Sequence, residues 1–151
     1  LVNYYDKKII VSTHPRTMKK LEDSGNLDLN KNILFLKPMG FFDYINLQKN
    51  SFCVISDSGT ITEEAAILNF PAIMIRDSHE RPEGMDEGVL IMSGLEKSNV
   101  IEAIEIVKSL NSNERRFEIP NDYNVNNFSK KVVKIIFSYI DYVNRTVWYK
   151  Y

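Results

Sequence analysis

The sequence contains a single cysteine, Cys53, which excludes a disulfide framework and leaves no cysteine set for a structural zinc site. Cys53 lies within an apolar run, so we interpret it as a packing residue rather than a reactive thiol. No apolar run approaches the roughly 20 residues that a membrane-spanning helix needs. A signal-peptide pattern is also lacking. We therefore expect cytoplasmic residence, with no membrane partner.

The charges show no excess of either sign, with 19 Lys and Arg against 20 Asp and Glu in 151 residues. This balance gives no basic field for binding nucleic acid. The sequence also lacks a Gly-x-Gly-x-x-Gly fingerprint and a Walker-type loop. It therefore does not contain the motifs that bind a nicotinamide cofactor or hydrolyse ATP. We expect no cofactor and no metal. The length fits one domain of ordinary size, although a start at Leu1 directly before a strand pattern suggests a piece of a longer protein.

Apolar segments of strand length alternate with helical patterns along the chain. Strands are predicted at 8–12, 33–36, 52–55, 72–75 and 89–92. Helices are predicted at 16–24, 41–49, from about residue 60 to 68, around 100–110, and at 128–148. Residues 76–87 are predicted to be a loop, and 111–126 a polar segment on the surface. This alternation predicts an α/β fold with one Rossmann-like parallel sheet covered by helices on both faces.

The stretch 51–69 is the most informative part of the sequence. An apolar strand pattern ends in a turn of small polar residues, and a helical pattern follows. Ser58 or Thr60 is expected to cap this helix, with Glu63 at the spacing of a capping box. Gly59 would let an anion approach the free N–H groups of the helix N-terminus. A purely structural turn remains an alternative.

Polar segments follow four of the predicted strands. In α/β sheets, ligands bind beyond the carboxyl ends of parallel strands. We therefore expect the four loops to converge on one edge of the sheet. They comprise residues 14–16, 37–42, 57–60 and 76–87.

Two linked motifs in these loops carry a resemblance to a known family. They read Ser-Asp-Ser-Gly-Thr-Ile-Thr-Glu-Glu at 56–64 and His-Glu-Arg-Pro-Glu-Gly-Met at 79–85, with Asn-Phe-Pro-Ala at 69–72 and Arg76 between them. They resemble the non-hydrolysing UDP-N-acetylglucosamine 2-epimerase family, in which Asp-Ser-Gly-Gly-Ile-Gln-Glu-Glu precedes Pro, Arg and Glu-Arg-Pro-Glu. Thr60 replaces the second Gly, and Thr62 the Gln. The segments 13–17 and 141–145 resemble the capsule and O-antigen branch, which includes enzymes that make UDP-N-acetyl-L-fucosamine.

The resemblance implies a two-domain fold of the GT-B type, of which this chain is the later part of the C-terminal domain. Residues 1–126 would form the UDP-binding domain, incomplete at its N-terminus, and 127–151 a helix crossing toward an N-terminal domain. The family reaction eliminates UDP across C1–C2 of a UDP-N-acetylhexosamine and adds it back after inversion at C2. The main acid/base carboxylates would lie in the N-terminal domain, so the chain alone is expected to be inactive. A homodimer is expected for the full-length protein.

The resemblance also implies roles for individual residues. Tyr44 would lie against uracil, and Glu64 would accept hydrogen bonds from the ribose hydroxyls. The phosphates would contact Ser58, Gly59 and Thr60. Arg81 would belong to the sugar-diphosphate site, and the catalytic candidates in this chain are His14 and Arg81.

Several alternatives stay open on the sequence alone. His14 fits a structural hydrogen bond as well as a sugar contact, and Tyr44 fits the core. Glu63 fits a helix cap better than a ligand contact, and Arg76 could pair with Asp77 or Glu80. For the function, the alternatives are a nucleotide-sugar glycosyltransferase of the same architecture and a non-catalytic nucleotide-binding module.

Overall fold

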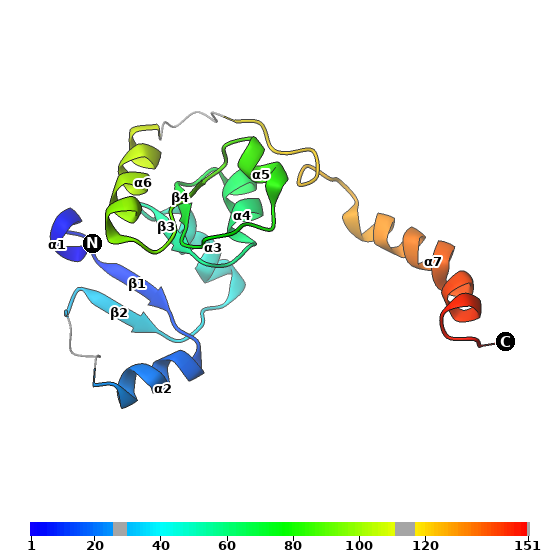
Figure 1. Cartoon of the computed structure of the whole chain (residues 1–151), viewed down its shortest axis with the longest axis horizontal. Helices are drawn as coiled ribbons and strands as arrows, with labels where there is room; N and C mark the ends of the chain where they lie inside the picture. The colour runs from blue at the N-terminus through cyan, green and yellow to red at the C-terminus, as the bar shows by residue number, and fades with distance from the viewer. Residues whose placement is uncertain (26–29, 111–116, 151) are drawn as a thin grey trace.

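The computed structural model describes residues 1–25, 30–110 and 117–150 (Figure 1). All strand pairs are parallel, and they form two sheets. One sheet contains β1 (Ile9–Ser12) and β2 (Ile33–Leu36), and the other has the order β3 (Val54–Ser56), β4 (Ala72–Met74), β5 (Ile91–Met92). The helices are α1 (Val2–Tyr5), α2 (Pro15–Asp23), α3 (Phe41–Lys49), α4 (Ile61–Leu68), α5 (Pro82–Asp86), α6 (Lys97–Leu110) and α7 (Phe128–Thr146).

The predicted strands and the longer helices are present, with shifts of one to three residues at several ends. The prediction of a loop over 76–87 is wrong, because α5 occupies its second half. Pro82 stands in the first turn of α5, where a missing N–H is harmless and the fixed φ suits the helix. The short helix α1 was not predicted, since its four residues are too few to show a periodic pattern.

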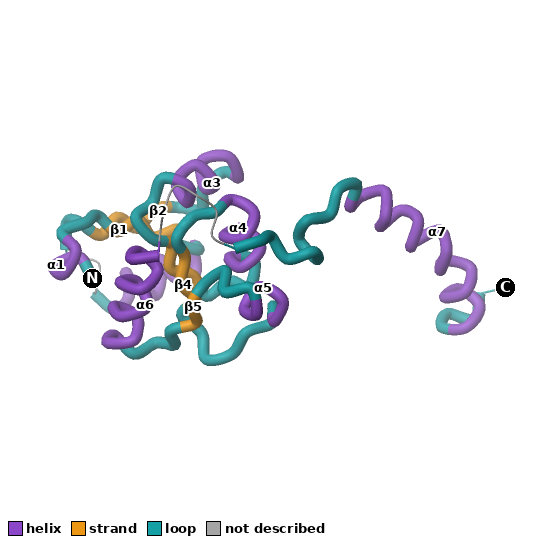
Figure 2. The backbone as a smooth tube through the Cα atoms, turned by 90° about the horizontal axis from the view of Figure 1, so that it is seen from above, coloured by secondary structure: helices purple, strands orange, loops and turns teal. Residues whose placement is uncertain are grey.

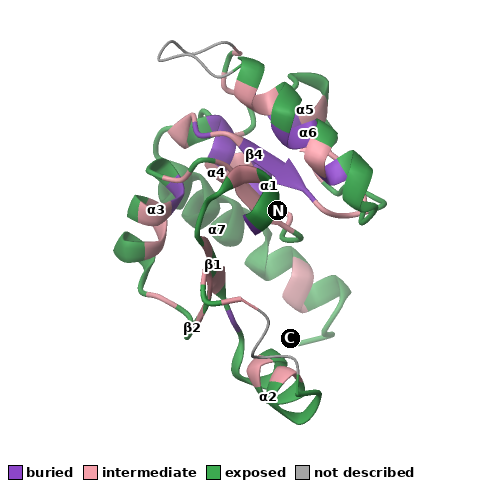
Figure 3. Ribbon diagram, turned by 90° about the vertical axis from the view of Figure 1, so that its left-hand side faces the viewer, coloured by how far each residue is buried: buried purple, intermediate pink, exposed green. Residues whose placement is uncertain are grey.

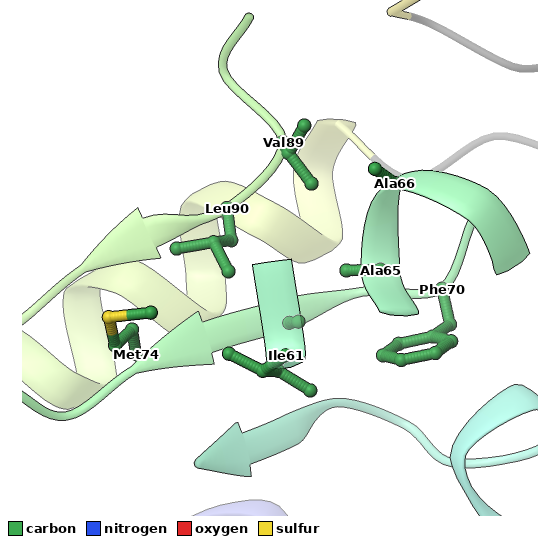
Figure 4. Close-up of a cluster of buried hydrophobic side chains, with 8 residues drawn as sticks. Ile61, Ala65, Ala66, Phe70, Met74, Val89 and Leu90 are labelled. Carbon is green, nitrogen blue, oxygen red and sulfur yellow. The ribbon is translucent and has the colours of Figure 1, made fainter. Parts of the chain in front are cut away.

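Strand β4 lies at the centre of the core, and its two faces pack against different helices. Met74 belongs to one buried cluster with Ile61 and Ala65 of α4, shown in Figure 4. Ile73 points to the opposite face and packs with Ala103 and neighbouring residues of α6. Figure 3 shows the buried positions concentrated around β4. Helices therefore cover both faces at this strand, as the α/β prediction requires.

The prediction of one continuous sheet is wrong for the described residues. Strand β1 pairs with β2 on one edge, and β3 pairs with β4 on one edge, but no described strand joins β1 to β3. In Figure 1 the arrows of β1 and β2 lie side by side, apart from β3 and β4 of the three-stranded sheet. Within each sheet, a helix connects each pair of neighbouring strands, which is the crossover connection that parallel strands need.

The C-terminal helix α7 lies apart from the rest of the chain in Figures 1 and 2, and none of its residues is buried. Its exposed apolar side chains include Ile135, Ile136, Phe137, Tyr139 and Ile140. Of the predicted surface segment, 111–116 lie outside the described residues, but Phe117 and Tyr123 pack against the core. No helix in the described residues is both long and apolar enough to span a membrane.

Candidate functional site

The turn between β3 and α4 presents unused backbone donors. The Ser58 N–H donates to Ser56 Oγ at 3.1 Å, and the hydroxyls of Ser58 and Thr60 are 3.0 Å apart. In contrast, no acceptor among the described residues receives the backbone N–H of Gly59 or Thr60. Both groups lie at the N-terminus of an eight-residue helix, where the helix dipole adds positive potential. This geometry is suited to an anion.

The predicted capping of this helix is wrong. Thr60 is the N-cap residue, but its side chain makes no capping hydrogen bond. Glu63 does not reach back to the cap, because its Oε1 accepts a hydrogen bond from Arg81 Nε at 2.7 Å. A guanidinium is a stronger partner for a carboxylate than a neutral backbone N–H, since both partners are ionised. The backbone N–H groups of Gly59 and Thr60, just before the first turn of α4, therefore receive no side-chain cap.

Arg81 brings a positive charge next to this turn. A Cβ placed on Gly59 would lie 3.8 Å from Arg81 Cζ, and 3.7 Å from Glu80 Oε2. The hydrogen bond to Glu63 raises the pKa of the Arg81 guanidinium, which also donates to the Glu80 carbonyl at 3.2 Å. Arg76 forms an ion pair with Glu80 at 2.8 Å, so Glu80, and not Asp77, is its partner. The cation is thus fixed beside the free N–H groups.

A second group of polar side chains lies farther along α4. Gln48 of α3 donates from Nε2 to Glu64 Oε2 at 2.5 Å, and the Gln48 side chain is buried. Burial and the Glu64 charge raise the pKa of the nearby Tyr44 hydroxyl. Tyr44 itself is half-buried, so it is neither a full core residue nor freely exposed. An aromatic ring, an amide and a carboxylate therefore lie together.

The sequence analysis did not single out Gln48. Its position four residues after Tyr44 places both side chains on one face of α3, which is the signal that could have identified it. Its Oε1 atom is buried and has no hydrogen-bond partner among the described residues. Buried polar atoms are rarely left unpaired, so this atom is a candidate acceptor for a ligand donor. Tyr123, which donates to Glu83 Oε1 at 2.7 Å, was also missed because it follows an irregular segment.

His14 has a local structural role. It is the N-cap of α2, and its Nδ1 accepts a hydrogen bond from the Arg16 N–H at 3.2 Å. The side chain is exposed. His14 therefore makes the structural hydrogen bond that was one of its two predicted roles. Its catalytic role stays a prediction.

Helix α4 joins the two groups of side chains. Glu63 holds Arg81 beside the turn, and the adjacent Glu64 contacts α3 on another side of the helix. Contacts therefore connect the loop after β3, the helix after β2 and the loop after β4. Among the described residues, none of these contacts involves His14. The site combines anion donors with a carboxylate able to bind hydroxyl groups. The described residues contain no cluster of three or more His, Cys, Asp or Glu suited to a metal.

A family model described as UDP-N-acetylglucosamine 2-epimerase matches residues 1–137. Among curated proteins, the UDP-N-acetylglucosamine 2-epimerase of Methanococcus maripaludis is 38% identical over 136 residues. That alignment covers 88% of this chain and 36% of the relative. This match extends across both groups of side chains described above.

Solved structures give the same result. The UDP-N-acetylglucosamine 2-epimerase from Rickettsia bellii is 51% identical, with a TM-score of 0.85, and covers 99% of this chain. The Methanocaldococcus jannaschii enzyme, solved with UDP-GlcNAc and UDP, is 35% identical with a TM-score of 0.79 and covers 91% of this chain. The chain spans 41% and 37% of these two proteins, respectively, so it corresponds to less than half of each. The predicted fold class, part of a GT-B-type α/β protein, is confirmed.

Proposed function

Because this chain belongs to the UDP-N-acetylglucosamine 2-epimerase family, we propose that it is the UDP-binding part of an enzyme that inverts C2 of a UDP-N-acetylhexosamine. One observation carries the proposal: the free N–H groups of Gly59 and Thr60 lie beside Arg81, while Glu64 lies on the same helix. A nucleoside diphosphate needs this pairing of anion donors with a carboxylate for its sugar hydroxyls.

In this proposal the diphosphate lies at the turn after β3. The N–H groups of Gly59 and Thr60 and the Ser58 hydroxyl donate to phosphate oxygens, and Arg81 neutralises their charge. Glu64 accepts hydrogen bonds from the ribose, with Gln48 holding one of its oxygens. Tyr44 packs against the base.

The proposed reaction releases UDP from C1 while a proton leaves C2, and UDP adds back after the proton returns to the opposite face. Here the chain's own residues bind and orient the departing diphosphate, whose negative charge grows as the C1–O bond breaks. The proton transfers at C2 need positioned acid/base groups. We place those groups in an N-terminal domain of a longer polypeptide. His14 remains a secondary catalytic candidate.

The biological role proposed from the resemblance is in capsule or O-antigen polysaccharide biosynthesis. The cytoplasmic location and the homodimer stay predictions. The relatives described above are named as epimerases, which favours the epimerase over the glycosyltransferase and the non-catalytic module. An acceptor-independent reaction of the UDP-sugar would separate the first two.

Exchange at C2 in deuterated water tests this proposal. The 151-residue chain and a longer polypeptide that also contains the N-terminal domain are each incubated with UDP-N-acetylhexosamines, and deuterium at C2 is followed by NMR. The longer polypeptide is expected to exchange, and the chain alone is expected to match a blank. Exchange by the chain alone would mean that the acid/base residues lie within Leu1 to Tyr151. Failure of the longer polypeptide to exchange would contradict the epimerase assignment.

A further inference from the structure

Helix α5 is too short to fix its own position. It has five residues, Pro82–Asp86, and isolated helices of this length are not stable in water. Arg81 is its N-cap residue, and the Arg81 carbonyl accepts hydrogen bonds from the N–H groups of Gly84 and Met85 at 3.2 and 3.3 Å. The position of the Arg81 backbone therefore depends on the contacts that hold the first turn of α5.

Side chains from two other segments hold this turn. Gly84 is buried, and a Cβ added to it would clash with Thr62 Cγ2 of α4. The same Cβ would lie 3.1 Å from the hydroxyl oxygen of Tyr123 and 3.5 Å from Cε2 of its ring. The Tyr123 hydroxyl also donates to Glu83 Oε1 at 2.7 Å. The first turn of α5 is thus held by α4 and by Tyr123.

Tyr123 is itself fixed in place. Its N–H donates to the carbonyl of the buried residue Pro120 at 2.9 Å. Its half-buried ring packs against the core cluster that contains Ile61 and Val89. Burial and the nearby Glu83 raise the pKa of the Tyr123 hydroxyl, so it stays a neutral hydrogen-bond donor at neutral pH. Tyr123 therefore provides a fixed contact against which α5 is positioned.

The guanidinium of Arg81 is held at one end by α4 and at the other by the backbone of α5. Arg81 Nε donates to Glu63 Oε1 of α4 at 2.7 Å. The backbone of Arg81 begins the turn that Tyr123 holds through Glu83. A cation must be placed to within a fraction of an ångström to stabilise a bound anion well. The placement of the Arg81 guanidinium beside Gly59 therefore depends on both contacts.

The hydrogen bond from Tyr123 also keeps the Glu83 carboxylate occupied. That bond lowers the pKa of Glu83, and the charge of Arg81 lowers it further, so the two charges are within electrostatic range. A Glu83 carboxylate released from Tyr123 would become a competing partner for Arg81. Loss of the tyrosine hydroxyl would thus both loosen α5 and offer Arg81 an alternative to the ligand.

We propose, on the basis of the diphosphate site proposed above, that Tyr123 is a positioning residue for Arg81 and acts through Glu83 and the first turn of α5. Tyr123 does not itself contact the ligand. It belongs to the segment that leads into α7, so a part of the chain outside the strand-end loops also shapes the site.

The Arg81 side chain can be followed without nucleotide. Its Nε–Hε group gives a signal in the ¹H–¹⁵N spectrum of the labelled 151-residue chain, and Arg81→Lys identifies that signal by removing it. Tyr123→Phe keeps the ring and removes one hydrogen bond, so the chain is expected to stay folded. The Arg81 signal is expected to shift and its Hε to exchange with water about threefold faster, because the Glu63 contact is made less of the time. Tyr139→Phe on α7, where the ring is exposed, is the matched control and should leave the signal unchanged.

A double-mutant cycle on UDP affinity tests the route through Arg81. Titration calorimetry is expected to show about threefold weaker UDP binding by Tyr123→Phe, but less than about 1.5-fold further loss when Arg81→Gln has already removed the cation. A purely structural role of Tyr123 would lower the affinity equally with and without Arg81. Glu83→Gln leaves the tyrosine ring in place and is measured in the same two backgrounds, where its loss of affinity should also depend on Arg81. If Tyr123→Phe does not fold, this second variant decides.

An unchanged Arg81 signal in folded Tyr123→Phe would overturn the proposal. Equal losses of UDP affinity with and without Arg81 would overturn it as well. If Arg81→Gln weakens UDP binding but Tyr123→Phe and Glu83→Gln do not, the proposed function stands and the positioning role alone is wrong. If the parent chain binds no UDP, both fail.

Discussion

Arg81 Nε lies 2.7 Å from Glu63 Oε1, although 18 positions separate the two residues in the sequence. The contact connects the start of α5 to the first turn of α4. It uses the carboxylate that would otherwise be free to cap α4, and it holds a guanidinium beside Gly59. The position of the cation in the proposed diphosphate site therefore depends on Glu63.

The first prediction follows from this contact. Glu63→Gln keeps the side-chain size but removes the charge that orients Arg81, so UDP affinity is expected to fall by about threefold to tenfold. Titration calorimetry measures the change, with Glu102→Gln on the exposed side of α6 as the matched control. Equal UDP affinities of the two folded variants would show that Arg81 does not depend on the Glu63 charge for its position.

Glu64→Gln is expected to weaken UDP binding by roughly 1.5–3 kcal/mol, the scale of a hydrogen bond to a charged group. The prediction rests on the position of Glu64 on α4 near Tyr44, where Gln48 already donates a hydrogen bond to one of its carboxylate oxygens. Calorimetry with UDP is the test, and circular dichroism checks the fold. An unchanged affinity in a folded variant would remove Glu64 from the site.

Gly59→Val is expected to abolish most UDP binding while leaving the fold intact. A Cβ at this position meets nothing closer than 3.7 Å, so the chain itself has room for it. The branched side chain would instead occupy the space through which a phosphate reaches the helix N-terminus. Gly59→Ala adds a smaller side chain and is expected to lose less UDP affinity than Gly59→Val. Normal UDP binding by the valine variant would place the diphosphate elsewhere.

Gly84 offers a stability test away from the proposed ligand. A Cβ here would clash with Thr62 Cγ2, on a fully buried side chain of α4. Gly84→Ala is therefore expected to lower the free energy of unfolding by about 1–3 kcal/mol through overpacking. Urea denaturation measures the difference. Gly40→Ala, whose Cβ has its nearest neighbour at 3.9 Å, is the control. Equal effects of the two variants would refute the tight packing of α5 on α4.

The Tyr123–Glu83 hydrogen bond predicts a dependence of stability on pH. The bond lowers the pKa of Glu83 below its ordinary value of 4.5, so the ionised carboxylate favours the folded state. This contribution is fully present above that ordinary value and is lost as the pH falls through the lower folded pKa. Tyr123→Phe should therefore reduce stability at pH 7 and reduce it much less near pH 3. A difference from the parent chain that is the same at both pH values would contradict this.

Local sequence patterns predicted most of the elements. The segments 33–36 and 41–49 were placed with their observed ends, since apolar periodicity and a preceding Gly40 define them. The helix α5 was missed because it is only five residues long and contains Pro82 and Gly84, which are typical of loops, and because its packing against Thr62 is not visible in any local pattern. The split between the two sheets was also missed, because alternation of strands and helices does not specify which strands are neighbours.

The candidate site was only partly predictable. Motif spacing identified Gly59, Glu64 and Arg81, and the structure brings the elements that carry them together. The partners of these residues were not predictable, because the Glu63–Arg81 contact depends on how two loops pack. The spacing of Gln48 from Tyr44 could have placed it on the same face of α3, but its contact with Glu64 depends on how α3 packs against α4.

A UDP titration of the isotope-labelled chain, followed by ¹H–¹⁵N NMR, tests the central claim most directly. The account predicts weak binding, because one wall of a two-walled cleft encloses only part of the ligand. The largest shift changes should fall on the amides of Ser58, Gly59 and Thr60 and on the side-chain amide of Gln48. ADP should produce smaller changes near Tyr44. UDP-induced changes confined to other parts of the chain, or none at millimolar UDP, would contradict the assignment of this chain as the UDP-binding part of the enzyme.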